Sequence, residues 1–412
     1  MRKPMKLALT LLLAACQPDA VPESPIVRAD SAGVEVVQTN RPRWDAETVW
    51  TVDPAPEVRI GLLEGELPYL FSNIAGVVVL TDGTIVVADG QSREVRFFDR
   101  SGRFQRAVGG EGEGPGEFDN LASLYKCGGG LYTHDLWQRR ITVWSLEGDL
   151  ERTFVLNEPG TDRGPYGYRC GPGGSFVVAG WGSLRGPPAR PGASFDLYAQ
   201  PAPLWLLDEE GQLSLELGEY VSSERLRMIN PLRGSGPHPF GRSVVYALGA
   251  DHIFIGSAER LEVEVYDRSG RLLRIMRGPD DELGITDSFL AEYRSAQLSG
   301  IDSVGRAQLE EAGMLMPPAM PAFTYFLLDT EGNLWVKRFH PPWEEGNRWG
   351  VFSPDGEFYG DVDMPIGLEV MDITVDYVLG VTRDDLDVER VELLALRRPA
   401  VTSPKSGNRN DP

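Results

Sequence analysis

The chain has 412 residues, 42% of them hydrophobic, and its 47 glycines and 31 prolines suit a fold of many short strands and turns. Its formal net charge of −21 argues against the basic surface that nucleic-acid binding requires, so we expect no nucleic-acid partner. The acidity instead favours solubility or the attraction of cations.

The N-terminus has the charge order of a secretory signal. Its apolar run, residues 7–15, is too short to span a bilayer as a helix and follows three basic residues, Arg2, Lys3 and Lys6. The run ends in Leu-Ala-Ala-Cys, which resembles the lipobox of bacterial lipoproteins. The resemblance implies that Cys16 is lipidated and becomes the first mature residue; the alternative is an ordinary signal peptide with an incidental cysteine.

A lipid at Cys16 implies a location in the bacterial cell envelope and a membrane contact through the anchor. In this class of lipoprotein a residue other than Asp after the cysteine implies transport to the outer membrane, and Gln17 stands there. Residues 17–45 are expected to be a flexible tether that leaves the protein facing the periplasm or the cell surface.

Residues 109–156 contain one whole unit of a structural repeat. A Gly-rich crossing loop leads into an apolar strand that ends at Tyr125, and a Gly turn joins it to a second strand at 131–134. A third strand at 141–145 then turns at Leu-Glu-Gly-Asp into a fourth. Two hairpins in tandem, each closed by Gly, predict a four-stranded antiparallel sheet.

The same unit recurs along the chain. First hairpins occur six times, at 73–89, 121–135, 168–180, 243–256, 324–337 and 370–381. Second hairpins occur five times, with turns at Asp99, Ser145, Asp208, Asp267 and Ser353. The missing outer strand of the sixth unit is expected from residues 48–60, because closing the ring with the first strand removes exposed sheet edges. The prediction is therefore an all-β, six-bladed propeller over 46–398, followed by a disordered tail at 399–412.

These units resemble the NHL-type repeat, in which a Gly-rich stretch and Phe lead into the inner strand, an Asp ends the second strand and an Arg opens the third. The whole of 46–398 is similar to uncharacterised bacterial six-bladed propeller lipoproteins. Asp89 and Asp135 match the repeat, whereas Gly180, Ser257 and Arg338 replace the Asp in blades three, four and five. The two Asp residues are expected to bond backbone amides of the following turn.

The long insertions all fall on one face of the predicted ring. Loops after the second and fourth strands share this face, here called the elaborated face, and they include 183–203, 220–242, 279–322 and 340–348. The opposite face, called the plain face, has only short turns. The largest insertion, between blades four and five, has helical spacing after Thr286 and again at 302–312, so it is either a strut or a lid.

Arginines, histidines and an aromatic side chain are concentrated in these loops. They are candidates to bind an acidic group or a sugar ring: Arg185, Arg225, Arg227, Arg233, His238, Arg242, Arg338, His340 and Trp343. The alternative is that these arginines merely pair with the surplus carboxylates. The four histidines have no metal-ligand spacing, so a zinc enzyme is disfavoured.

Oxygen-bearing side chains at the starts of inner strands suggest a second kind of site. Asn73 and Asn120 are expected near the central channel, where Glu369 or Asp372 of blade six would join them. Six-bladed sugar-lactone hydrolases hold Ca²⁺ with such ligands, so the resemblance implies a calcium-dependent lactonase or esterase as the alternative function. The other interpretation is that the Asn residues bond backbone.

The main interpretation is a binding or scaffold module for a protein, peptide or glycan partner, monomeric and without a cofactor. The sequence contains no G-x-S-x-G and no Ser-His-Asp order that would support a hydrolytic triad, and no enzyme is needed to explain it. Cys127 and Cys170 precede the Gly turns of consecutive first hairpins, and export would permit a disulfide between them. Two separate, half-buried thiols are the alternative.

Overall fold

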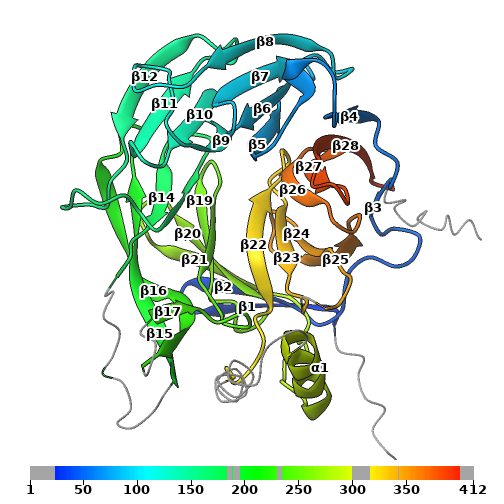
Figure 1. Ribbon diagram of the computed structural model, residues 1–412. Coiled ribbons are helices and arrows are strands. Elements are labelled where there is room, and N and C mark those ends of the chain that lie inside the picture. The colour runs from blue at the N-terminus through cyan, green and yellow to red at the C-terminus, as the bar shows by residue number, and fades with distance from the viewer. Residues whose placement is uncertain are drawn as a thin grey trace, which may run out of the picture.

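Six sheets are arranged in a ring in the computed structural model (Figure 1). The structure describes residues 24–182, 188, 195–229, 234–298, 316–341 and 343–399. The predicted all-β six-bladed propeller is confirmed. Several predictions concern residues outside the described ranges: Cys16 and its lipid, Arg185, Arg233, the second helix at 302–312, and the tail beyond residue 399.

The first two blades follow the repeat closely. Blade one consists of β5 (Ile74–Val79), β6 (Ile85–Asp89), β7 (Glu94–Phe98) and β8 (Phe104–Gly109). Blade two consists of β9 (Leu121–Cys127), β10 (Gly130–Asp135), β11 (Arg140–Trp144) and β12 (Leu150–Val155). Asp135 plays the predicted backbone role, since its carboxylate accepts hydrogen bonds from the amides of Asp119, Asn120, Trp137 and Gln138.

The remaining blades keep the same antiparallel order. Blade three has β13 (Gly167–Cys170), β14 (Phe176–Ala179), β15 (Phe195–Leu207), β16 (Leu213–Met228) and β17 (Gly234–Pro237). Blade four has β18 (Val245–Leu248), β19 (His252–Gly256), β20 (Glu262–Asp267) and β21 (Leu272–Arg277). Blade five has β22 (Phe323–Leu328), β23 (Leu334–Arg338), β24 (Arg348–Phe352) and β25 (Phe358–Asp363).

Blade six is closed by the N-terminal part of the chain, as predicted. Its own strands are β26 (Glu369–Ile373), β27 (Tyr377–Arg383) and β28 (Glu389–Arg397), and β28 pairs with both β3 (Thr51–Val52) and β4 (Val58–Ile60). Ile60 is 1% exposed and belongs to the apolar cluster between blades six and one. The segment with β3 and β4 thus completes the sheet of blade six and contributes to the core beside it.

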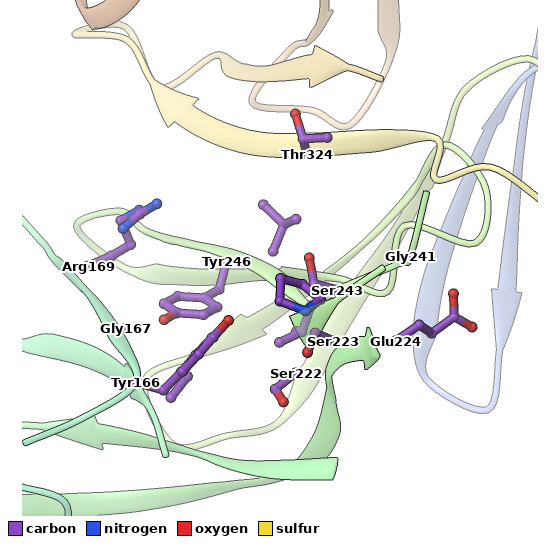
Figure 2. A pocket seen from close by; sticks show the side chains of 14 residues that line it. Tyr166, Gly167, Arg169, Ser222, Ser223, Glu224, Gly241, Ser243, Tyr246 and Thr324 are labelled. Atoms are coloured by element: carbon purple, nitrogen blue, oxygen red, sulfur yellow. The ribbon is translucent and has the colours of Figure 1, made fainter. Parts of the chain in front are cut away.

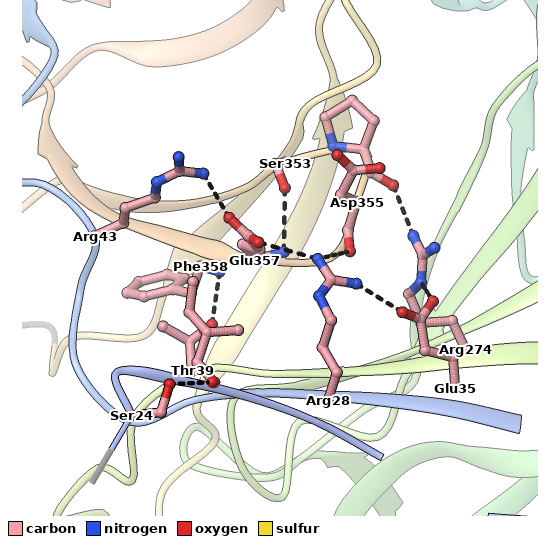
Figure 3. Close-up of polar contacts among 12 residues, drawn as sticks. Ser24, Arg28, Glu35, Thr39, Arg43, Arg274, Ser353, Asp355, Glu357 and Phe358 are labelled. Carbon is pink, nitrogen blue, oxygen red and sulfur yellow. Dashed lines mark hydrogen bonds and ion pairs between the residues drawn. The ribbon is translucent and has the colours of Figure 1, made fainter. Parts of the chain in front are cut away.

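The tether predicted for 17–45 is wrong over residues 26–39. These residues form a hairpin of β1 (Ile26–Ser31) and β2 (Val34–Thr39), turned at Ala32 and Gly33, which both have positive φ. β2 pairs in parallel with the outer strand β21 of blade four. The side chain of Arg28 bridges Glu35 and Glu357, and Glu35 also binds Arg274, so ion pairs join the hairpin to blades four and five (Figure 3).

Two of the predicted loops of blade three are largely strands. Residues 195–203 and 220–228, expected as loop, extend β15 and β16 into a long twisted hairpin beyond the blade, with β17 added at its edge. The predicted helix exists as α1 (Asp287–Leu298), and the side chain of Thr286 accepts a hydrogen bond from the amide of Phe289 at its start.

The core consists of apolar clusters between neighbouring blades, because each strand presents alternate side chains to the two faces of its blade. Between blades two and three, Cys127 and Cys170 form the predicted disulfide, with their Cα atoms 6.0 Å apart. The turns carrying the two cysteines are close enough for a bridge because adjacent blades pack directly.

Candidate functional site

The elaborated face exposes large apolar side chains that the plain face mostly lacks. Leu67, Trp137 and Leu386 are 78%, 66% and 68% exposed, and all three lie in loops that follow a second or fourth strand. Other exposed apolar residues in such loops are Leu62, Leu63, Leu136, Tyr166, Trp181 and Ile366. Among the described residues, the plain-face turns contribute Val375 to the exposed large apolar side chains, and Leu150 and Leu213 are exposed at the starts of β12 and β16, directly after such turns. Exposed apolar surface gathered on one face is typical of an interaction site.

An aromatic cluster holds α1 onto this face. Phe240 is fully buried and meets the rings of Phe289, Tyr293 and Trp343 at centroid distances between 5.0 and 5.8 Å. The indole nitrogen of Trp343 donates to Glu292 on α1. Trp343, predicted as a ligand contact, is thus part of the packing beneath the helix, which favours the strut interpretation of this insertion.

Two cavities lie at the inner strands of the ring. The smaller cavity, called the entrance cavity, has a volume of about 250 Å³. It lies at the elaborated face, between the extension of β16 and the starts of β13, β18 and β22 (Figure 2). The larger, about 900 Å³, is the central channel and reaches the plain-face turn at Gly249 and Asp251. Arg169 on β13 lines both cavities.

Aromatic rings surround Arg169. Its guanidinium carbon is 4.6 Å from the ring centroid of Tyr325 and 6.0 Å from that of Tyr246, and its Nη1 donates to the carbonyl of Tyr168. Burial raises the pKa of Tyr125, Tyr168 and Tyr246 above the ordinary tyrosine value. These phenols therefore stay neutral at physiological pH and do not balance the guanidinium charge.

The arginines predicted from the sequence are mostly paired. Arg227 binds Asp196, Arg242 binds Glu224 and Glu259, and Arg338 binds Asp281, as the alternative interpretation expects. Arg225 donates to the side chain and carbonyl of Ser235. They do not form one open cationic patch.

The two predicted histidines are also engaged in local structure. His238 is 5% exposed and accepts a hydrogen bond from the amide of Phe240. His340 contacts the carbonyl of Pro341 through Nδ1.

Three of the four predicted metal ligands come to equivalent positions. The inner strands β5, β9 and β26 each have one unpaired residue near their start, where the register shifts. Counted from this shift, Asn73, Asn120 and Glu369 occupy the same position in blades one, two and six. All three residues line the channel. Asp372 is separate: it accepts hydrogen bonds from Ile373 and from Val79, at the far end of β5 from Asn73.

The oxygen donors at this end fit a hard cation only in part. Glu369 supplies the one carboxylate, and it lies 3.9 Å from Arg383. Within the described ranges, no group of three or more His, Cys, Asp or Glu side chains is arranged to hold a metal ion.

Arg169 was not predicted as a functional residue. Its sequence context, Tyr-Arg-Cys before a Gly turn, matches Tyr-Lys-Cys at 125–127 in blade two. A basic residue at the same place in two successive inner strands could have indicated that Arg169 lines the channel. Lys126 also lines the channel, where its amine donates to the carbonyl of Val79.

Comparison with known proteins agrees with this architecture. The DUF5128 family model, described as a 6-bladed beta-propeller, matches residues 60–157. No curated protein matches the sequence. Among the described residues, no helix has both the length and the hydrophobicity to cross a bilayer.

Solved structures that this chain is similar to include several propellers. A Bacteroides fragilis protein described as exported has 12% identity and a TM-score of 0.44, over 88% of this chain and 98% of that one. Virginiamycin B lyase from Staphylococcus aureus has 10% identity and a TM-score of 0.41, over 85% and 100% of the two chains. The calcium-binding protein regucalcin from Agrobacterium tumefaciens has 11% identity and a TM-score of 0.38, over 85% and 96%. At these values the similarities support no statement about a ligand or activity of this chain.

Proposed function

We propose that this protein is a lipid-anchored propeller outside the cytoplasm, in the cell envelope, that works as a binding or scaffold module through its elaborated face. The observation that carries the proposal is the set of exposed apolar side chains in the loops of that face, including Leu67, Trp137 and Leu386. Trp and Leu side chains exposed together favour a protein or peptide partner over a glycan.

Two features support the location. The Cys127–Cys170 disulfide suits an oxidising compartment, and the lipobox-like sequence at Cys16 provides the anchor. Because the docked hairpin begins close after Ser24, only the short stretch from Cys16 to Ser24 is left as tether. Eight residue steps span at most about 29 Å, so the anchor would hold the propeller close to the membrane.

The docking proposal is tested by site-specific photo-crosslinking in cells that make the full-length chain. A photoreactive phenylalanine derivative replaces Trp137 or Leu386 on the elaborated face, and Val375 or Leu213 on the plain face as matched controls. We expect discrete covalent adducts from the first pair and none from the second. Equal adducts from both faces, or none from the elaborated face, would contradict the proposal.

A calcium-dependent lactonase- or esterase-like hydrolase at the channel mouth is the second candidate, favoured by the equivalent positions of Asn73, Asn120 and Glu369. After dialysis against a chelator, added Ca²⁺ should raise the melting temperature of the native protein but not of the Asn73→Ala plus Asn120→Ala double variant. If Ca²⁺ leaves the native melting temperature unchanged, this candidate is dropped.

A further inference from the structure

Two basic side chains of the described residues, Lys126 and Arg169, line the channel, and they differ in whether a carboxylate acts on them. Each carboxylate that lines the channel has a basic residue other than Arg169 near it. Asp329 binds Arg398, and Glu369 lies near Arg383. The charge of Lys126 acts on Asp372, and that of Asp251 acts on Arg268. Glu224, the carboxylate of the entrance cavity, is held by two hydrogen bonds from the Arg242 side chain and one from its amide. By contrast, no carboxylate of the described residues forms an ion pair with Arg169.

Such a cation is unusual in a chain with a formal net charge of −21. A buried charge is normally paired, since leaving water is costly for an ion. The ring of Tyr325 and the carbonyl of Tyr168 fix the guanidinium in place without neutralising it. Its Nε and the Oγ of Ser223, which lines the same entrance cavity, have no hydrogen-bond partner. The lining of the cavity therefore includes polar groups without a partner as well as a fixed positive charge.

We propose that Arg169 is the anchor of a binding site for a small organic carboxylate. The planar guanidinium offers paired N–H donors whose spacing matches the two oxygens of a carboxylate. Tyr246 and Tyr325 supply aromatic walls for a flat or apolar remainder of the ligand. An entrance cavity of about 250 Å³ limits the ligand to a molecule smaller than a typical drug. The inference rests on the proposed binding function and names a ligand class for it.

Access to Arg169 comes from the elaborated face. Tyr166, Ser243, Thr324 and Arg169 line the entrance cavity (Figure 2), and Arg169 lies farther from the elaborated face along β13 than Tyr166, which precedes the strand. A carboxylate entering here would meet neutral hydroxyls first and then the guanidinium. Since Glu224 on this wall is already paired with Arg242, it does not repel an anion strongly.

The test uses benzoate as the probe, with benzamide as its uncharged counterpart and inorganic phosphate as a second anion. Isothermal titration of the purified protein should show benzoate binding and benzamide binding at least about tenfold weaker, because the charge-assisted bonds are lost. Phosphate binding as tight as that of benzoate would show a general anion site and overturn the carboxylate assignment.

Variants then assign the binding to this residue. Arg169→Met should abolish benzoate binding. Arg169→Lys should weaken it about tenfold, because the paired N–H donors of the guanidinium are lost while the positive charge remains. Arg271→Met, an equal charge change at a residue that lines neither cavity, should leave benzoate binding unchanged. The proposal is overturned if benzoate does not bind the native protein, or if it binds Arg169→Met as well as the native protein.

Two controls keep the outcome clear. Circular dichroism and thermal melting show whether Arg169→Met folds, and Arg169→Lys provides the comparison if it does not. The crosslinking at Trp137 and Leu386 does not depend on Arg169. Adducts without benzoate binding would refute the carboxylate site alone, whereas benzoate binding without adducts would refute the partner surface alone.

Discussion

His134 illustrates how burial controls a single titrating side chain. It lies on β10, is 5% exposed, and its ring meets the ring of Tyr168 at a centroid distance of 5.1 Å, while Nε2 has no hydrogen-bond partner. Burial lowers the pKa of this imidazole from 6.5 to about 4, against the smaller opposing effect of the Asp135 charge. The neutral form is the one that fits the core.

This pKa makes stability depend on pH. Because the folded-state pKa is lowered, the contribution of His134 is fully present above pH 6.5 and is lost as the pH falls toward about 4. A shift of this size corresponds to a loss of roughly 3 kcal/mol. His134→Phe should remove that part of the pH dependence, measured as the unfolding free energy in urea at about pH 4.5 and 7.5. Parallel pH curves for the two proteins would contradict the assignment.

The disulfide is a second prediction at the residue scale. Cys127 and Cys170 are 43 residues apart, and closing a loop of that length stabilises the fold by roughly 3 to 4 kcal/mol in the chain-entropy model. The double variant Cys127→Ala plus Cys170→Ala should therefore unfold at lower urea concentration. A reductant should lower the unfolding free energy of the native protein but not that of the variant. If the reductant does not change the unfolding free energy of the native protein, the disulfide contributes little to stability.

At the scale of elements, the N-terminal hairpin is the largest departure from the sequence-based expectation. β2 covers the edge of β21, Val37 is fully buried, and the hydroxyl of Thr39 accepts a hydrogen bond from the amide of Phe358 in blade five. The hairpin therefore protects a sheet edge and links two blades, which a flexible tether would not do.

Two truncations separate tether from hairpin. Removing residues 17–23 should leave the melting temperature unchanged, whereas removing 17–39 should lower it by several degrees because the β21 edge and the Arg274 and Glu357 ion-pair partners lose their contacts. Individual surface ion pairs contribute little, so most of the effect should come from the ladder and Val37. Equal melting temperatures for the two truncated proteins would restore the tether interpretation.

The sequence predicts elements that carry their own turn signals. Gly turns at regular spacing located the blades, and Thr286 marked the start of α1. The apolar and polar residues of 34–39 have a pattern that resembles a strand. Nothing in the local sequence indicates that this strand pairs with β21, more than 230 residues later. The extension of β15 and β16 was not predicted because it contains prolines, such as Pro201 and Pro203, which are typical of loops. Pro201 lies at a register shift, where the ladder is interrupted.

At the scale of the whole molecule, charge balance depends on which segments the ring brings together. Arg227, Arg242 and Arg338 were predicted as ligand contacts from their loops, but the fold supplies each with a carboxylate. Arg169 differs because the inner strands of blades four and five place Tyr246 and Tyr325 beside its guanidinium. Pairing across blades is a three-dimensional property, so the sequence could indicate the fold and the elaborated face but not the unpaired cation.

The ring closure leads to the last prediction. Extending the deletion from 17–44 to 17–61 removes β3 and β4, and with them the pairing of Val58 and Ile60 to β28 and the place of Ile60 in the core. The shorter deletion already lacks the hairpin, so the difference between the two proteins reports the loss of the closing strands together with the packing of Trp50 on Trp335. We expect the longer deletion to aggregate or to melt far lower, because an open ring exposes both an unpaired edge and apolar surface. Thermal melting and size-exclusion chromatography measure this, and a soluble 62–412 protein that melts with the shorter deletion would show that the ring does not need its N-terminal strand.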